Sequence, residues 1–256
     1  MSDPLVAIVC GYERGGTTLV SEILRQHPQL NSGFEGGLLL SDNPHDFRDL
    51  EPYVTSLKIS WGVNDEELEY ICDGAGWQDV FRRLLEKSRN VDGEFIFDKT
   101  PKYMEFLPDV MSRVDVPCIA IVRDPRALFF SWAKRSAMSI DKWCENHLAA
   151  AIQRYASYGH GLKNALVKYR DRILVVQYES LCVNPMIETE RLMSFIGFDF
   201  DPAFVQFSNP QDNIHEKNVS AKYIFEYEKH FGDEACATIT YRLNEFKDWF
   251  WNRTPS

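Results

Sequence analysis

The run Leu5-Val-Ala-Ile-Val-Cys-Gly-Tyr-Glu-Arg-Gly-Gly-Thr-Thr18 decides the fold. Its first six residues form an unbroken apolar stretch, which is typical of a parallel strand buried on both faces. A glycine loop follows, and an amphipathic helix is expected over 17–26. Backbone N–H groups and the helix dipole of such a strand–loop–helix unit often hold a phosphate group. The run therefore predicts an anion site directly after the first strand.

Further apolar runs along the chain predict more strands of the same kind. They alternate with amphipathic stretches, and such alternation favours a parallel sheet with right-handed crossovers and helices on both faces. We expect an α/β fold of three α/β/α layers with a central parallel sheet of 4–5 strands, in which ligands bind at the carboxyl ends of the strands. The expected strands are 5–10, 94–97, 118–122 and 173–177, and the expected helices after 17–26 are 65–72, 78–88, 106–114, 125–134, 140–169, 186–196 and one near 233–251.

Composition limits the classes of function. The chain has 256 residues, 45% of them hydrophobic, and 28 Lys+Arg against 38 Asp+Glu give a formal charge of −10. We expect one domain over 1–256, whose part after about residue 185 is mainly helical and covers the bound ligands. The acidic balance disfavours binding to nucleic acid or to an anionic membrane. The sequence does not indicate an oligomeric state.

The N-terminus and the cysteines indicate a compartment. There is no basic n-region before the first apolar run, and no apolar run reaches the roughly 18 residues of a membrane span. The six cysteines are scattered, without Cys-x-x-Cys pairs or clustered histidines. We therefore expect a cytoplasmic protein with no membrane segment, no disulfides and no metal site.

The glycine loop departs from the phosphate loop of nucleoside triphosphatases in one informative way. Against the pattern G-x-x-x-x-G-K-[ST] it matches Gly11, Gly16 and Thr18, but Thr17 occupies the lysine position. Threonine is too short and uncharged to reach the β- and γ-phosphates. The cation of this loop is Arg14, whose guanidinium could grip an anion from the other side. An ordinary strand–helix turn that merely needs glycines is the alternative.

Polar residues follow the other strands as well. Arg123 closes the third strand, Asp124-Pro125 is a good helix start, and Ser131 lies two turns into the helix. Taken singly, Arg123 also fits a surface ion pair and Ser131 a helix-face hydroxyl. The second and fourth strands lead into Asp98-Lys-Thr-Pro-Lys102 and Gln177-Tyr-Glu-Ser-Leu181.

Together these segments resemble the sulfotransferases, whose donor is 3′-phosphoadenosine 5′-phosphosulfate (PAPS), and whose fold is similar to that of P-loop nucleotide hydrolases. Residues 14–18 resemble the 5′-phosphosulfate loop, R-[SG]-G-T-[ST], and the pair Arg123 and Ser131 resembles the 3′-phosphate motif. Residues 98–102 resemble the [DE]-K-[ST]-P segment, and 177–181 the Y-E-x-L segment, of bacterial, tyrosylprotein and heparan-type enzymes. The ordered set covers about residues 5–185, and the last seventy residues resemble the family loosely.

The resemblance implies roles for named residues. Those expected to bind the donor are Arg14, Gly15, Gly16, Thr17 and Thr18 at the 5′-phosphosulfate, Arg123 and Ser131 at the 3′-phosphate, Tyr178 beside it, and Ser220 and Lys222 in a loop that closes over the nucleotide. That loop, within 211–222, lacks the R-x-G pattern of some relatives. PAPS would leave as adenosine 3′,5′-bisphosphate (PAP), and no metal would be required.

The resemblance also implies a catalytic set of Arg14, Lys99 and Glu35. Lys99 would reach the bridging or a sulfonate oxygen, and Glu35, in Gly33-Phe-Glu-Gly-Gly37, would be the general base as in tyrosylprotein enzymes. The histidines at 45 and 215 are alternative bases, because whether a Glu or a His removes the proton stays open. The acceptor is a hydroxyl on a small molecule or a peptide, and the carboxylates within 38–89 disfavour an anionic glycan.

Two other functions compete with this interpretation. Phe95-Ile-Phe-Asp98 resembles a Walker B strand, so a P-loop-type nucleotide or small-molecule kinase is an alternative, weakened by the missing loop lysine. A non-catalytic nucleotide-binding module is a second alternative, which Glu35 and Lys99 beside the loop disfavour. Under the sulfotransferase interpretation, five cations are expected to converge at the strand ends: Arg14, Lys99, Lys102, Arg123 and Arg126.

Overall fold

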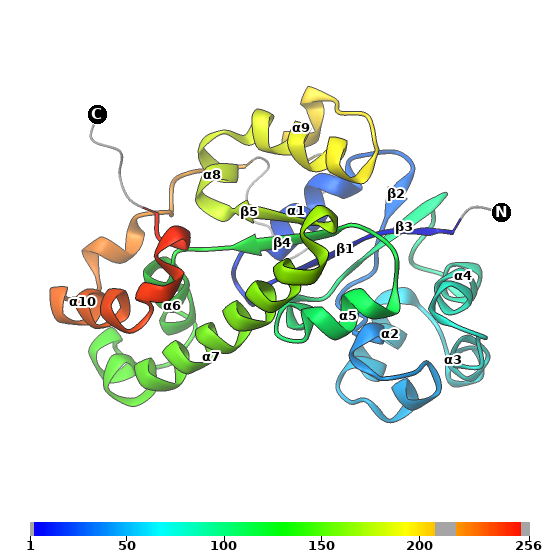
Figure 1. Ribbon diagram of the computed structural model, residues 1–256, viewed down its shortest axis with the longest axis horizontal. Helices are drawn as coiled ribbons and strands as arrows, with labels where there is room; N and C mark the ends of the chain where they lie inside the picture. Colours follow the sequence, from blue (N-terminus) through cyan, green and yellow to red (C-terminus); the bar gives the residue numbers. More distant parts are fainter. Residues whose placement is uncertain (1–2, 208–218, 252–256) are drawn as a thin grey trace.

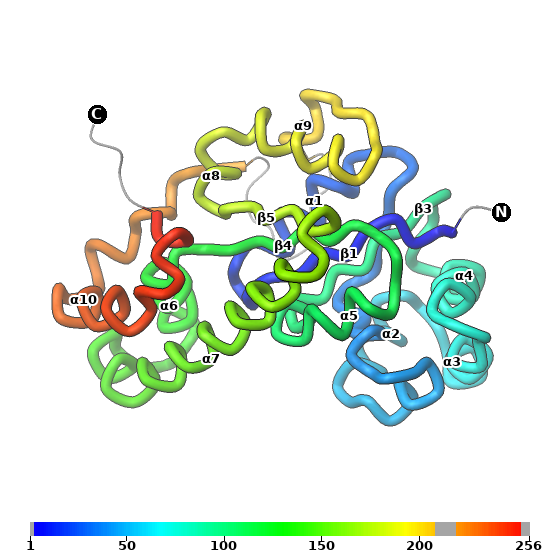
Figure 2. The backbone as a smooth tube through the Cα atoms, viewed as in Figure 1, coloured from blue at the N-terminus to red at the C-terminus, as the bar shows by residue number. Residues whose placement is uncertain are grey.

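A five-stranded parallel sheet forms the centre of the protein, which we describe from a computed structural model over residues 3–207 and 219–251. The strand order is β2-β3-β1-β4-β5, so β1 lies in the middle (Figures 1 and 2). The strands are β1 (Leu5–Gly11), β2 (Leu30–Asn31), β3 (Phe95–Lys99), β4 (Cys118–Val122) and β5 (Ile173–Gln177). The α/β fold with a parallel sheet of four to five strands is confirmed.

Both faces of the sheet are buried, which explains the unbroken apolar runs. Along β1, Ile8 and Cys10 contribute to one core, whereas Ala7 and Val9 contribute to the core on the opposite face. Successive side chains of a strand point to opposite faces, so a strand covered on both sides needs apolar residues at every position.

Helices cover the two faces as separate layers (Figure 1). The helices of one face are α1 (Thr17–Arg25), α8 (Tyr178–Val183) and α9 (Pro185–Ile196), and the other face carries α5 (Leu107–Arg113) and the long α7 (Ile140–Tyr169). The crossover from β2 to β3 contains α2 (Tyr53–Trp61), α3 (Asp65–Cys72) and α4 (Trp77–Lys87). Beyond the carboxyl end of β4 come α6 (Pro125–Ala133) and, later in the chain, α10 (Asp233–Arg242).

Short 3-10 helices connect these elements. They are η1 (Leu38–Leu40), η2 (His45–Asp49), η3 (Pro101–Met104), η4 (Arg170–Arg172), η5 (Pro202–Val205), η6 (Glu226–Lys229) and η7 (Asn244–Trp249). Within the described part of the chain, none of the helices is long and apolar enough to cross a membrane.

Local signals set several helix boundaries. The Asp124 side chain accepts a hydrogen bond from the backbone N–H of Arg126 at 2.8 Å, and Pro125 takes the first helical position, as the sequence predicts. The expected helix near 233–251 is wrong as one element, because α10 ends at Arg242 and the chain continues as η7. Lys99, expected after its strand, is the last residue of β3.

Candidate active site

A cleft of about 740 Å³ crosses the carboxyl end of β1. Phe34, Glu35 and Pro101 line it on the β3 side, and Arg123 and Tyr178 line it on the side of β4 and β5. The glycine loop lies between these two sides because β1 lies between β3 and β4. This is the edge of a parallel α/β sheet at which ligands bind.

Close packing fixes the path of the glycine loop. A Cβ added to Gly11 would lie 2.6 Å from Ile121, and one added to Gly16 would lie 2.4 Å from the Tyr178 ring. Gly16 also has φ +109, a backbone conformation in which a residue with a side chain would be strained. It precedes α1, whose N-terminus has no side-chain cap, so the N–H groups of the first turn are available to an anion.

Three arginines surround this helix start. Arg14 and Arg135 line the cleft with Arg123, and Arg123 donates a hydrogen bond to the Arg14 carbonyl at 2.8 Å. Burial, together with the charges of Arg135 and Arg123, lowers the pKa of Arg14. None of the three has an ion-pair partner among the described residues. Cations packed this closely produce a local positive potential, which attracts anions.

The segment after β5 orients this wall of the cleft. The Arg123 guanidinium lies 4.3 Å from the centre of the Tyr178 ring, and Glu179 accepts a hydrogen bond from the Asp124 backbone N–H at 3.1 Å. Burial raises the pKa of Glu179 to about 7. The Tyr-Glu pair therefore joins the end of β5 to the end of β4 and holds the arginine beside the loop.

On the other side of the cleft, Glu35 and Lys99 form an ion pair. Lys99 Nζ lies 3.1 Å from Glu35 Oε1 and 3.8 Å from the centre of the Phe34 ring. The Lys99 side chain is 1% exposed, whereas that of Glu35 is 28% exposed. Burial lowers the pKa of Lys99, and the Glu35 charge opposes that shift. Glu35 thus borders the cleft while Lys99 lies behind Phe34.

A buried hydrogen-bond network holds the loop that carries Glu35. Asp98 accepts hydrogen bonds from Thr100 Oγ1 at 3.1 Å and from the Tyr103 hydroxyl. Thr100 Oγ1 in turn accepts from the Gly37 N–H at 3.0 Å, and the Tyr103 hydroxyl accepts from the Leu39 N–H at 3.1 Å. Burial raises the pKa of Asp98 to about 6. The Asp-Lys-Thr-Pro segment therefore both contributes a lysine and fixes the neighbouring loop.

Helix α2 supports the same loop from outside. Ser56 donates a hydrogen bond to the Glu35 carbonyl at 3.1 Å, and Ser60 donates one to the Phe34 carbonyl at 2.7 Å. A Cβ on Gly33 would lie 2.4 Å from the Trp61 indole, which explains a glycine at this contact. Glu35 has φ +26, and Arg14 has φ +68, the two non-glycine residues with positive φ among those described. Such strain persists where the surroundings over-determine it, often at functional sites.

The sequence of the chain also matches a family model. A model described as the sulfotransferase family covers residues 5–202 of the chain. The chain belongs to the sulfotransferase family. The membership of the sulfotransferase family that the four strand-end segments predict is confirmed. The alternative interpretation as a P-loop-type kinase is not supported by this match.

Individual relatives of this sulfotransferase are distant. Nodulation protein NoeE of Sinorhizobium fredii (strain NBRC 101917 / NGR234) is 23% identical over 230 residues, which are 80% of the chain and 52% of NoeE. The chain thus spans about half the length of that relative. Among solved structures, the sulfotransferase domain of the Synechococcus PCC 7002 olefin synthase has a TM-score of 0.71 at 19% identity, covering 98% of each chain. Mouse sulfotransferase SULT7A1, solved as a complex with PAP, has a TM-score of 0.56 at 13% identity, over 93% of this chain and 83% of that one.

The sulfotransferase cleft gathers most of the residues predicted for the site. Those that line it are Arg14, Gly16, Thr17, Thr18, Glu35, Arg123, Ser131, Tyr178 and Ser220. Gly15 donates its backbone N–H to the Tyr12 carbonyl at 2.8 Å. Lys222 lies near the Tyr223 ring rather than among the lining residues, and residues 211–218 of the expected covering loop, including His215, fall outside the described residues.

Three of the five cations expected at the cleft, Lys99, Lys102 and Arg126, are not among the residues that line it. Arg126 pairs with Asp124 and donates to the Trp251 carbonyl, so the carboxylate two residues earlier holds it away from the lining. Lys102 pairs with Glu105. The alternative base His45 is exposed and contacts Arg48 instead of the cleft.

Four charged residues that line the cleft were not predicted from the sequence: Glu13, Lys134, Arg135 and Glu226. Arg135 follows the end of α6, Lys134 precedes it, and Glu13 stands beside Arg14 in the glycine loop. The position of Arg135 could have been predicted from its spacing, because Ser131 and Arg135 are four residues apart and side chains at this spacing lie on the same side of a helical segment.

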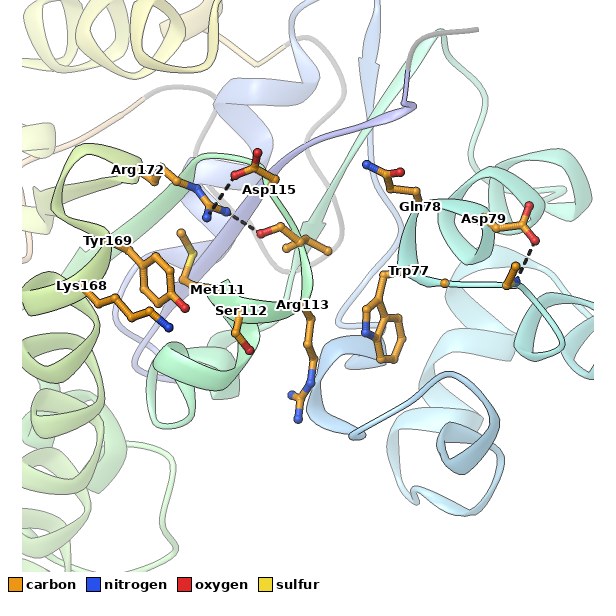
Figure 3. Close-up of a pocket in the computed structure, with 13 residues that line it drawn as sticks. Trp77, Gln78, Asp79, Met111, Ser112, Arg113, Asp115, Lys168, Tyr169 and Arg172 are labelled. Carbon is orange, nitrogen blue, oxygen red and sulfur yellow. Dashed lines mark hydrogen bonds and ion pairs between the residues drawn. The ribbon is translucent and has the colours of Figure 1, made fainter.

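A second cleft, of about 750 Å³, lies near the amino ends of β4 and β5, and Figure 3 shows the residues that line it. Its lining includes Trp77, Tyr169 and Arg172, and Arg172 pairs with Asp115 at 3.2 Å. Trp77 begins α4, Asp115 precedes β4, and Tyr169 and Arg172 lie between α7 and β5, so this cleft faces the amino ends of β4 and β5 and contains none of the predicted site residues. No group of three or more potential metal ligands occurs within 3–207 and 219–251.

Proposed function

We propose that this sulfotransferase transfers the sulfuryl group of PAPS to a hydroxyl acceptor, with Glu35 as general base. The observation that carries the proposal is the convergence of Arg14, Arg123 and Arg135 on one cleft without carboxylate partners among the described residues. PAPS bears anionic groups at both its 5′ and its 3′ position, and these arginines flank the two sides of the helix start. No metal takes part in the proposed reaction.

The donor would lie across the end of β1. Arg14 and the first-turn N–H groups of α1 would hold the 5′-phosphosulfate, since a helix N-terminus favours negative charge. Arg123, Ser131 and Arg135 would bind the 3′-phosphate, because a guanidinium fork suits phosphate oxygens. Tyr178 and Ser220 would border the nucleotide on the same wall.

The transfer itself is an in-line displacement at sulfur. The acceptor oxygen forms a bond to sulfur while the bond from sulfur to the bridging phosphate oxygen breaks, and PAP leaves with that electron pair. Glu35 takes the acceptor's proton, which is general base catalysis by a positioned carboxylate. Arg14 and the helix N-terminus stabilise the charge on the leaving phosphate.

Lys99 would stabilise the bridging oxygen, and its burial imposes a condition on that role. Its ammonium pairs with Glu35 and lies 3.8 Å from the centre of the Phe34 ring, and Lys99 is not among the lining residues, so contact with the donor requires these side chains to rearrange. If the Lys99 ammonium moved from Glu35 to an oxygen of the donor, the Glu35 carboxylate would become available to accept the proton of the acceptor.

Donor binding is tested without knowledge of the acceptor. PAP should raise the Tm of the protein in the absence of magnesium, and Arg135→Met should weaken PAP binding by about 10- to 100-fold, since hydrogen bonds to charged groups are worth roughly 1.5–3 kcal/mol. The matched control is Arg170→Met, an exposed arginine in η4. Stabilisation by ATP and magnesium but not by PAP would contradict the proposal.

The base is tested by separating binding from turnover. We expect Glu35→Gln to retain PAP binding and to lower the rate of sulfated product formation by about 100- to 10,000-fold. Product is detected by intact mass with labelled donor across an acceptor mixture. Unchanged turnover in this variant would place the base elsewhere, and absence of turnover in the wild-type protein despite tight PAP binding would favour a non-catalytic nucleotide-binding module.

A further inference from the structure

Tyr155, near the middle of α7, contacts both of the segments that carry the arginines Arg14 and Arg123. Its hydroxyl donates a hydrogen bond to the Arg123 carbonyl at 3.0 Å. Its ring stacks on that of Tyr12, with 4.3 Å between the ring centres and 8° between the ring planes. Because Tyr12 is the first residue after β1 and precedes Arg14 by two positions, one side chain of α7 joins the segment beyond β1 to the segment beyond β4.

Packing holds Tyr155 in place. The residue is fully buried, and the Tyr12 hydroxyl donates a hydrogen bond to its backbone carbonyl at 3.2 Å. The rings of Phe129 and Phe246 meet the Tyr155 ring edge to face, with 5.9 Å and 5.8 Å between the ring centres. Burial, together with the charge of Asp124, raises the pKa of the Tyr155 hydroxyl well above its ordinary value. The hydroxyl therefore keeps its proton and remains a hydrogen-bond donor.

Arg123 is held from both faces of the sheet. Tyr155, which belongs to the core on the α7 side, binds its carbonyl, whereas the Tyr178 ring, packed against the opposite core, lies 4.3 Å from its guanidinium. The guanidinium also donates to the Arg14 carbonyl at 2.8 Å. Arg123 lines the cleft and Tyr155 does not, so Tyr155 can affect a ligand in the cleft only through the residues that it contacts.

We infer that Tyr155 is a positioning residue for recognition of the 3′-phosphate, because its hydroxyl fixes the main chain from which Arg123 reaches the cleft. This inference rests on the proposed function, in which Arg123 binds the 3′-phosphate of the donor. The ring of Tyr155 contacts the segment beyond β1, and the hydroxyl contacts Arg123. Loss of the hydroxyl alone should therefore weaken ligands that carry a 3′-phosphate more than ligands that lack it.

The test compares two nucleotides that differ in the 3′-phosphate alone. The Kd values of PAP and of adenosine 5′-monophosphate (AMP) are measured by calorimetry for the wild-type protein and for Tyr155→Phe, which keeps the ring. In the wild-type protein we expect PAP to bind about 10- to 100-fold more tightly than AMP, the range of a hydrogen bond to a charged group. We expect Tyr155→Phe to lower this ratio by about 3- to 10-fold, the range of one neutral hydrogen bond.

Tyr158→Phe is the matched control. Tyr158 lies three residues further along α7 and is buried, but its hydroxyl donates to Glu13 Oε1 at 2.7 Å instead of to Arg123. Glu13 adjoins Arg14, which the proposed function places at the 5′ end shared by AMP and PAP. This variant should therefore keep the wild-type ratio of the two Kd values. A general loss of stability would weaken both nucleotides alike and would leave the ratio unchanged in either variant.

A second background tests whether Tyr155 acts through Arg123. Arg123→Met should lower the ratio by itself, because it removes a cation from the cleft. Adding Tyr155→Phe to Arg123→Met should lower the ratio no further, since two changes that act through one group are not additive.

The outcomes separate this inference from the proposed function. A wild-type ratio in Tyr155→Phe, an equal fall of the ratio in Tyr158→Phe, or additive effects of Tyr155→Phe and Arg123→Met overturns the inference and leaves the proposed donor site standing. A wild-type protein that binds PAP no more tightly than AMP has no 3′-phosphate site, and that result removes the proposed function together with the inference.

Discussion

Replacing the buried carboxyl group Asp98 by asparagine should change how stability depends on pH. Burial raises the pKa of Asp98 from 3.8 to about 6, although the hydrogen bonds from Tyr103 and Thr100 act in the opposite direction. The Asp98→Asn side chain has a similar shape and cannot titrate. A comparison of the two proteins over a range of pH therefore isolates the ionisation of this one group.

The sign and size follow from proton linkage. Between pH 3.8 and about 6 the folded protein binds more protons at Asp98 than the unfolded chain does. The free energy of unfolding contributed by this group is therefore fully present below the lower value and is lost as the pH rises through the upper one. A tenfold change in proton affinity corresponds to about 1.4 kcal/mol, so the raised pKa corresponds to roughly 3 kcal/mol.

Urea unfolding at a series of pH values, followed by tryptophan fluorescence, measures this difference. We expect the wild-type protein to lose roughly 3 kcal/mol more than Asp98→Asn between about pH 4 and about pH 7. The exposed Asp171→Asn is the matched control and should follow the wild-type curve. If the difference between wild type and Asp98→Asn is constant over this range, Asp98 does not titrate as a desolvated carboxyl group and the reasoning fails.

Two further substitutions test the donor side. Gly16→Ala places a Cβ 2.4 Å from the Tyr178 ring at a positive φ, so we expect the free energy of unfolding in urea to fall by roughly 1–3 kcal/mol and PAP binding in calorimetry to be lost. The control is Gly76→Ala, where a Cβ meets open space. Undiminished PAP binding by Gly16→Ala would disprove an anion site at this helix start. Glu179→Ala removes the acceptor of the Asp124 N–H and should cost roughly 1–3 kcal/mol at neutral pH. Because the pKa of Glu179 is raised to about 7, wild-type stability falls as the pH rises through that value, so this deficit should shrink in alkaline solution, and a constant deficit would contradict the assignment.

The strands and most helices could be predicted because their signals are local. The four longer strands each contain an apolar run, and α7 is found at its expected 140–169 because an amphipathic period extends over its whole length. The two-residue β2 is too short to have a pattern of its own. Helix α2 was missed because its exposed Ile59 interrupts the separation of polar and apolar faces.

The site was predictable where a residue type and a strand end coincide, as at Arg14 and Arg123. Contacts between residues that are far apart in the sequence could not be predicted. The ion pair between Glu35 and Lys99 joins residues 64 positions apart, and the contact of Lys99 with the Phe34 ring joins the same two distant segments. Arg126 has the same local features as a binding arginine, but Asp124 and Trp251 hold it.

The positive φ values of Arg14 and Glu35 have a consequence for how this protein changes under selection. Each residue holds a conformation that glycine adopts without strain, at a cost on the order of 1–3 kcal/mol. Variants chosen for heat resistance alone should therefore accumulate glycine at these two positions, and variants chosen for turnover should keep both side chains. Under the proposed function, stability and turnover therefore favour different residues at these two positions.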